Sequence, residues 1–216
     1  AALRGAMTLH LAPVGVCIAF LVALRAKRKG SLDRTGAAAA FIAGAIAFTA
    51  SVRFGTTLLA FFLSASRLTR VGARRKREVE GAEYAGEGGN RNWVQVFSNG
   101  FAATAIALAL IHDRLAKNAT APDLPIDIGG PDRWGAVLQV GYVCHYACCN
   151  ADTWASELGT LSAGRPVLLT TGKPVRPGTN GAISALGTAA SAAGGLFIGL
   201  SYFVAGPPGL PPPPPP

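Results

Sequence analysis

Residues 93–111 read WVQVFSNGFAATAIALALI, a run without a single charged side chain. A helix of this length, at 1.5 Å per residue, is about as long as the hydrocarbon core of a bilayer is thick. Comparable runs, almost free of charge, are Ala6–Leu24, Thr35–Ser66 (interrupted only by Arg53), Gly135–Ala151 and Ala182–Ala205. The sequence therefore predicts an all-α fold, a polytopic bundle of transmembrane helices in an integral membrane protein.

The composition of the 216 residues agrees with this fold class. Charged residues make up 14% of the chain, against about 25% in a typical soluble domain, and the mean hydropathy is +0.35. This balance excludes a disordered chain, which needs high charge and low hydropathy. A net charge of +9 would suit a nucleic-acid-binding protein. Because the cations lie in clusters between the apolar runs, we expect membrane lipids as partners and no nucleic acid.

Two clusters of cations, at 25–34 and 67–77, determine the expected topology. Basic loops favour the cytosolic side of a membrane, so both clusters belong on one face. The region between them then crosses an even number of times, and we expect two short spans broken near residues 53–55. A single span with the clusters on opposite faces is the alternative. The six expected spans are Ala6–Leu24, Thr35–Ser51, Phe54–Ser66, Trp93–Ile111, Trp134–Ala151 and Ala182–Ala205.

This topology places segments 25–34, 67–92 and 152–181 together on the cytosol-like face. Residues 1–206 are expected to form one transmembrane domain with a basic cytosol-facing loop at 67–92. Residues 74–77 of that loop are expected to contact anionic lipid head groups. The Pro-rich residues 207–216 are expected to be a tail without a packed fold, or the end of a fragment.

The four cysteines lie within apolar runs, so a disulfide framework is not expected. Cys144, His145 and Cys148 could in principle offer metal ligands on one helical turn. Packing inside a span is the preferred interpretation of these side chains.

Three amide side chains open the span at 93–111. Asn92, Gln95 and Asn99 are spaced i, i+3, i+7 and therefore form a stripe on one helical face. Such a stripe has to find partners in the bundle or line a wet cavity. Arg91 lies at the mouth of the same face, which favours a polar site.

A second polar group ends the span at 134–151. If the helix continues, Asp152 and Ser156 share one face, and Thr153 and Glu157 share a neighbouring one. Two acids at a membrane boundary, with hydroxyls one turn away, would suit a magnesium ion that carries nucleotide phosphates.

The third group, at 169–181, precedes the last span. Gly178, Thr179, Asn180 and Gly181 form a turn that is expected to lead into a helix start, where backbone N–H groups can bind an anion. Lys173 and Arg176 are close enough in sequence to add positive charge.

The stretches RNWVQVFSNG (91–100), ADTWASELG (151–159) and PGTNG (177–181) resemble the family of integral membrane proteins represented by transmembrane protein nineteen. FFLSASRLTR (61–70) and SLDRTG (31–36) fit the same family, so the resemblance extends to about Gly206. This family also includes the phytyl-phosphate kinases of plants and cyanobacteria, which use a nucleoside triphosphate. The Asn-Trp-Val-Gln stretch is more similar to the transmembrane-protein-nineteen branch than to the kinases.

The resemblance implies an isoprenoid-phosphate kinase that uses CTP or ATP with Mg²⁺ at the cytosolic face. Asp152 and Glu157 would hold the metal, and Lys173 would assist catalysis. Arg67 and Arg70 would guide the anionic substrate. The residues expected to bind phosphate or nucleotide are Arg91, Asn92, Gln95, Asn99, Thr153, Ser156, Gly178, Thr179, Asn180 and Gly181.

The alternative is a non-catalytic transporter or regulatory scaffold, in which the amide stripe would line a pathway. A pseudoenzyme that binds without transfer is a third possibility. The endoplasmic reticulum, the plasma membrane and the plastid envelope are all compatible with the sequence.

Overall fold

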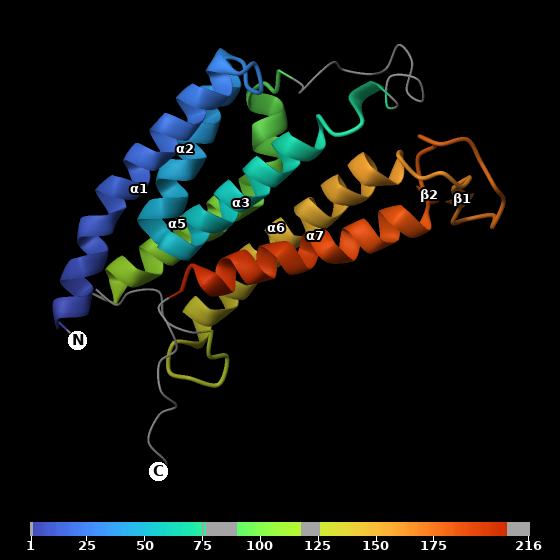
Figure 1. Ribbon diagram of the computed structural model, residues 1–216. Coiled ribbons are helices and arrows are strands. Elements are labelled where there is room, and N and C mark those ends of the chain that lie inside the picture. Colours follow the sequence, from blue (N-terminus) through green and yellow to red (C-terminus); the bar gives the residue numbers. More distant parts are fainter. Residues whose placement is uncertain (1, 75, 77–89, 118–125, 207–216) are drawn as a thin grey trace.

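A computed structural model describes residues 2–74, 76, 90–117 and 126–206. Within these residues the chain is mostly helical (Figure 1). The helices are α1 (Ala2–Arg28), α2 (Arg34–Ala50), α3 (Val52–Leu68), α5 (Trp93–Ala116), α6 (Arg133–Gly159) and α7 (Ala185–Val204). A short antiparallel pair, β1 (Val167–Leu168) and β2 (Ala182–Ile183), joins α6 to α7. The Pro-rich residues 207–216 lie outside the described part of the chain.

Each of the six expected spans overlaps a helix. Two of the described helices, α5 and α7, are long and apolar enough to cross a membrane by length and composition. Helix α2 is apolar but has only 17 residues. The positions of the helices therefore agree with the expected segments, while six crossings remain a prediction.

The break between α2 and α3 lies at Ser51, two residues before the expected position. Ser51 donates its backbone N–H to the carbonyl of Ala47 (2.9 Å). Its Oγ accepts the N–H groups of Arg53 (3.1 Å) and Phe54 (3.4 Å). Serine is a favoured N-cap residue, whereas Gly55 lies inside α3, where the ring of Phe48 fills the space of a Cβ. One serine therefore ends one helix and starts the next.

The start of α7 differs more strongly from the expectation. Gly178 (φ 84°) and Gly181 (φ 77°) adopt left-handed backbone conformations, and β2 follows them. Ser184 then caps α7, because its Oγ accepts the N–H of Gly187 at 3.1 Å. The glycine turn is therefore separated from the helix N-terminus, and the expected helix-start anion site does not form there.

Helices α2, α3, α5, α6 and α7 all contribute buried residues to the main core. Phe54 of α3 stacks on Tyr142 of α6, with 3.6 Å between the ring centroids, and the Tyr142 hydroxyl donates to the Phe54 carbonyl (3.1 Å). The buried Asn150 amide donates to the carbonyl of Gly194 (2.8 Å) and accepts the hydroxyl of Ser64 (2.8 Å). Polar groups inside a membrane bundle need such partners, so Asn150 fastens α6 to both neighbours.

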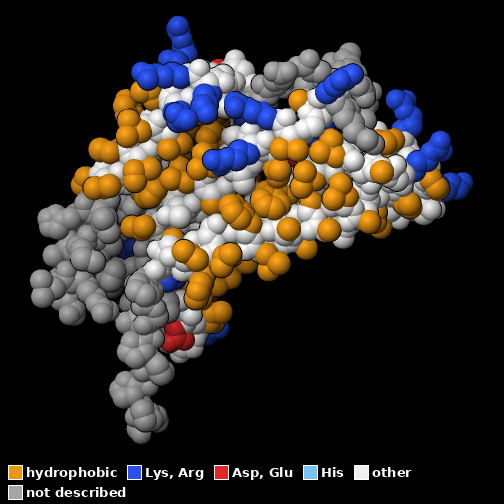
Figure 2. Space-filling view, viewed as in Figure 1, with side chains coloured by type: hydrophobic (Ala, Val, Ile, Leu, Met, Phe, Trp, Pro, Cys, Tyr) orange, Lys and Arg blue, Asp and Glu red, His pale blue; other side chains and the backbone are white. Residues whose placement is uncertain are grey.

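The helix ends gather at two opposite ends of the bundle (Figure 1). At one end, the N–H of Arg91 donates to the carbonyl of Ser31 (3.2 Å), and the N–H of Asp33 donates to the carbonyl of Arg91 (3.1 Å). At the other end, the Arg114 guanidinium donates to the carbonyl of Ala50. Figure 2 shows Lys and Arg side chains along the first end and hydrophobic side chains over the body of the bundle. We call the first end the basic end.

Candidate functional site

Many of the predicted site residues line one of two hollows on different faces of α6. The helix continues to Gly159, so residues four apart share a face. Asp152 and Ser156 line a hollow between α6, α7 and the β1–β2 connection, the polar cavity. Thr153 lines a second hollow between α1, α2, α3 and α5, the apolar cleft. Neighbouring residues of one helix therefore face separate spaces.

The polar cavity has a volume of about 750 Å³. Asp152 is the one charged side chain among the described residues that line it. All four residues of the glycine turn, 178–181, also line this cavity. Hydroxyl groups come from Ser156, Thr160, Thr179, Ser184, Thr188 and Ser191. The wall thus combines one carboxylate with many neutral donors and acceptors.

Close packing of α6 on α7 forms the base of this cavity. A Cβ on Gly187 would lie 3.3 Å from the carbonyl oxygen of Ala155 and 3.4 Å from the Cα of Gly159. Small residues allow such close backbone approach between membrane helices. The base of the polar cavity is therefore set by backbone rather than by mobile side chains.

The glycine turn is held by local hydrogen bonds. The Thr179 hydroxyl donates to the carbonyl of Arg176 at 2.8 Å, while Asn180 is exposed. Lys173 is exposed in the same connection and does not line the polar cavity, and Arg176 is likewise exposed. The structure thus brings Asp152 and the turn together and leaves both cations at the periphery.

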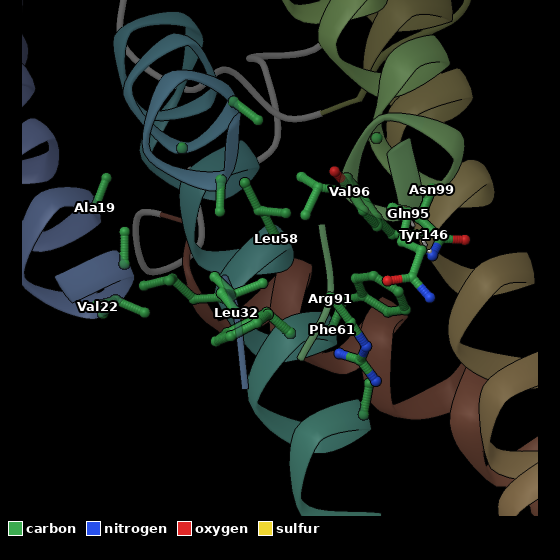
Figure 3. A pocket seen from close by; sticks show the side chains of 18 of the residues that line it. Ala19, Val22, Leu32, Leu58, Phe61, Arg91, Gln95, Val96, Asn99 and Tyr146 are labelled. Carbon is green, nitrogen blue, oxygen red and sulfur yellow. Dashed lines mark hydrogen bonds between the residues drawn. The ribbon is translucent and has the colours of Figure 1, made fainter. Parts of the chain in front are cut away.

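The apolar cleft has a volume of about 120 Å³ and is shown in Figure 3. Arg91, Gln95 and Asn99 lie along the side nearest to Tyr146. The other labelled walls are hydrophobic: Ala19, Val22, Leu32, Leu58, Phe61 and Val96. This hollow combines a hydrocarbon-like interior with a polar edge.

The amide stripe is partly a helix cap. Asn92 is the N-cap of α5: its side chain accepts the N–H of Gln95 (3.1 Å), and the Gln95 side chain accepts the N–H of Asn92 (3.1 Å). Asn99 donates to the carbonyl of Gln95 (3.3 Å). The Asn-x-x-Gln pattern ahead of an apolar run is the sequence signal for this capping box. Gln95 and Asn99 remain as the amides that face the cleft.

A charge cluster joins three segments at the basic end. The Lys76 ammonium lies 2.5 Å from a carboxylate oxygen of Glu157 and donates to the carbonyl of Leu68 (2.8 Å). The Thr69 hydroxyl donates to the other oxygen of Glu157 (2.9 Å) and accepts a guanidinium N–H of Arg91 (3.3 Å). Burial lowers the pKa of Arg91, and the charge of Glu157 partly offsets that effect.

Lys76 is the member of this charge cluster that the sequence pattern did not identify. It was expected at lipid head groups, but its side chain is 2% exposed. Arg74 of the same run is exposed, and Arg75 and Arg77 lie outside the described residues. The sequence does not show which cation of a basic run turns inward. Lys76 can be identified only once the position of its partner Glu157 is known.

Asp152 and Glu157, the expected metal pair, are not brought together. They lie on different faces of α6, and Glu157 is bound by Lys76. Within the described ranges there is no group of three His, Cys, Asp or Glu side chains that could hold a metal ion. Mg²⁺ needs only one or two protein carboxylates beside phosphate oxygens. Asp152 therefore fits a metal that arrives with a nucleotide.

The other candidate residues lie outside both hollows. The Arg70 guanidinium donates to the Ser31 hydroxyl (3.1 Å), and Arg67 is exposed in the last turn of α3. His145 donates from Nε2 to the carbonyl of Asn99 (2.8 Å). This bond gives His145 a packing role between α6 and α5.

Comparison with known proteins identifies relatives over most of the chain. The profile of the family described as integral membrane protein DUF92 matches residues 17–210. "Protein PGR" of Arabidopsis thaliana is 41% identical over 196 residues, which cover 88% of this chain and 64% of that protein. The chain therefore spans less than two thirds of the length of that relative.

Two microbial relatives are described only as uncharacterized membrane proteins. MJ0933 of Methanocaldococcus jannaschii is 29% identical over 188 residues, covering 87% of this chain and 68% of that protein. The protein sll0875 of Synechocystis is 32% identical over 183 residues, which cover 84% of this chain and 64% of that protein. No solved structure matches.

Proposed function

Because the chain belongs to the DUF92 family of integral membrane proteins, we propose that it is a membrane enzyme acting on a lipid phosphate. The reaction transfers a phosphoryl group from CTP or ATP to an isoprenoid monophosphate at the cytosolic face. The polar cavity carries the proposal, because it places Asp152 opposite the glycine turn at the basic end. The sequence resemblance to phytyl-phosphate kinases supports the same reaction.

The polar cavity suits a nucleotide in size and chemistry. Its volume of about 750 Å³ lies within the range of small-molecule sites, about 300–1,000 Å³. Asp152 would hold Mg²⁺, which would offset the charge of the phosphate oxygens. The hydroxyls of Ser156 and Thr188 would bind the nucleotide, and Lys173 would reach the outer phosphates from the rim.

The lipid acceptor is proposed to enter the same cavity. Leu169 and Ile183 line it and are 71% and 47% exposed, and Leu186 begins the apolar outer face of α7. An isoprenoid chain could lie against these side chains with its phosphate toward Asp152. Both reactants would then meet on one side of α6, whereas Arg91 lies on the other. Phosphoryl transfer depends on such positioning.

Six membrane crossings accompany this proposal. The ends of the described helices alternate between the two ends of the bundle. We assign the basic end to the cytosol, because Lys and Arg concentrate in cytosolic loops. At about 25 Å, α2 and α3 are short spans, and their shared joint at Ser51 would lie near the opposite surface.

Phosphate transfer tests the proposal. Purified protein in liposomes receives labelled CTP or ATP and phytyl, farnesyl or geranylgeranyl monophosphate. We expect product with the wild type and a loss of roughly 100-fold or more with Asp152→Asn, since one preorganised electrostatic contact can contribute that much. Asp127→Asn is the matched control, because Asp127 is exposed at the other end of the bundle.

Two outcomes would contradict the proposal. One is the absence of transfer to every acceptor by folded wild-type protein, which would favour the non-catalytic alternative, a transporter or regulatory scaffold. The other is full activity in Asp152→Asn, which would show that the reaction does not depend on the polar cavity carboxylate.

A further inference from the structure

The apolar cleft has features of a site for an amphiphile. Arg91 is the one charged side chain among the described residues that line it. Small residues from α1 and α2, such as Ala19, Ala43 and Gly44, line it together with Leu58 of α3. A guanidinium at the edge of a hydrocarbon-like groove suits a ligand with an anionic head and an apolar chain.

The charge of Arg91 is not balanced within the charge cluster. Glu157 contacts Lys76 at 2.5 Å, so that pair is neutral. Arg91 contacts the cluster through the neutral hydroxyl of Thr69. The guanidinium carries five N–H donors, and one of them is accounted for by this bond. Among the residues that the structure describes, the Arg91 guanidinium therefore keeps a positive charge and further N–H donors at the edge of the cleft.

The direction of the cleft matches the direction of a lipid in a leaflet. Arg91 lies at the basic end, hydrogen-bonded through its backbone to Ser31 and Asp33. From there the lining continues along α1, α2 and α3 to Leu58, near the middle of α3. A head group at Arg91 would thus be level with the basic loops, and an acyl chain would point into the membrane.

We propose that the apolar cleft binds one anionic phospholipid of the surrounding membrane, with its phosphodiester at Arg91 and the first part of one acyl chain in the hollow of about 120 Å³, the rest of the lipid lying outside it. A phosphodiester carries one negative charge, which matches the single unbalanced guanidinium. Gln95 and Asn99 line the same edge and can bond the ester oxygens. This lipid is separate from the proposed substrate, because α6 lies between the two hollows. The inference does not depend on the kinase assignment.

Lipid retention tests the proposal without nucleotide or turnover. Purified protein in neutral detergent is mixed with equal amounts of dioleoyl phosphatidylglycerol and dioleoyl phosphatidylcholine, and bound lipid is counted by native mass spectrometry. We expect the wild type to prefer phosphatidylglycerol about fivefold, the scale of one basic residue near a lipid surface. Arg91→Gln should lose this preference, and Arg91→Lys should keep most of it.

Two further variants separate the cleft from the basic surface. Arg67→Gln removes an exposed arginine of the same end that does not line the cleft, and it should keep the fivefold preference. Ala43→Leu fills the cleft while Arg91 stays in place, and it should reduce retention of phosphatidylglycerol several-fold.

Three results would overturn the proposal. Arg91→Gln could keep the preference, or Ala43→Leu could retain phosphatidylglycerol as well as the wild type does. Displacement of phosphatidylglycerol by equimolar farnesyl monophosphate would also reject a phospholipid and assign the cleft to a phosphomonoester lipid.

Discussion

The two faces of α6 near its end carry the same kind of residue in opposite environments. Asp152 faces the polar cavity, and it is the one charged side chain among the described residues that line this cavity. Glu157, five residues later, is enclosed by Lys76 and Thr69. A carboxylate bound by a buried cation holds helices together, whereas one beside an open hollow is available to a ligand. Proximity in sequence therefore does not make two acids a metal pair.

The largest effect on stability is expected on the enclosed face. Glu157→Gln leaves the buried ammonium of Lys76 without its counter-charge, which should lower the free energy of unfolding by about 3 kcal/mol. Asp152→Asn, the matched change on the open face, should stay within about 0.5 kcal/mol. Thermal and denaturant unfolding in one detergent would measure both. Equal losses of unfolding free energy for the two variants would contradict the difference between the enclosed and the open face of α6.

An intermediate effect is expected for Thr69→Val. The Thr69 hydroxyl links Glu157 to Arg91, so its removal should lower stability by about 1 kcal/mol. Thr49→Val is the control, because the exposed Thr49 hydroxyl bonds, among the described residues, the carbonyl of Ala45 in its own helix. A loss for Thr49→Val as large as for Thr69→Val would show that the link between segments adds nothing.

The smallest effect is expected for Asp132, a third acid, at the other end of α6. The hydrogen bond from Lys117 (2.9 Å) and the N–H of Gly135 hold the pKa of Asp132 below its ordinary value of 3.8. A carboxylate with a lowered pKa stabilises the fold above its unfolded pKa, and this contribution is lost as the pH falls through the folded value.

Unfolding measured from pH 6 down to pH 3 should therefore show a loss of stability below about pH 4 that is slightly smaller in Asp132→Asn. The difference should be at most about 0.5 kcal/mol, because the pair is exposed. A steeper loss in the variant would reverse the expected sign.

The helices were predictable because long apolar runs between charge clusters constrain a membrane chain strongly. The local motifs also indicated an integral membrane family, and the DUF92 match confirms that coarser assignment, while the resemblance to transmembrane protein nineteen and the phytyl-phosphate kinases stays a prediction. The sequence also contains the signals for two helix caps, the capping box at Asn92 and the N-cap at Ser51. Asn92 was instead assigned to a polar site, and the helix break was expected at residues 53–55. Both caps follow from side chains that bond the next few backbone N–H groups.

The arrangement of the candidate site was less predictable. Lys76 and Glu157 are 81 residues apart, and their contact depends on how α3 and α6 pack. The β1–β2 pair likewise depends on contacts between residues 167–168 and 182–183. Helical periodicity assigned Asp152 and Glu157 to different faces, but it could not show which face was enclosed.

The joint at Ser51 couples the orientation of α3 to that of α2. Only one residue separates the two helices, and it bonds to backbone groups of both. There is therefore no loop between them that could change conformation when one helix tilts. Because the 17 residues of α3 extend about 25 Å, a rotation of about 5° at Ser51 would move the far end of the helix by about 2 Å. That end carries Thr69, so a small change at one end of the bundle is enough to separate Glu157 from its partners at the other.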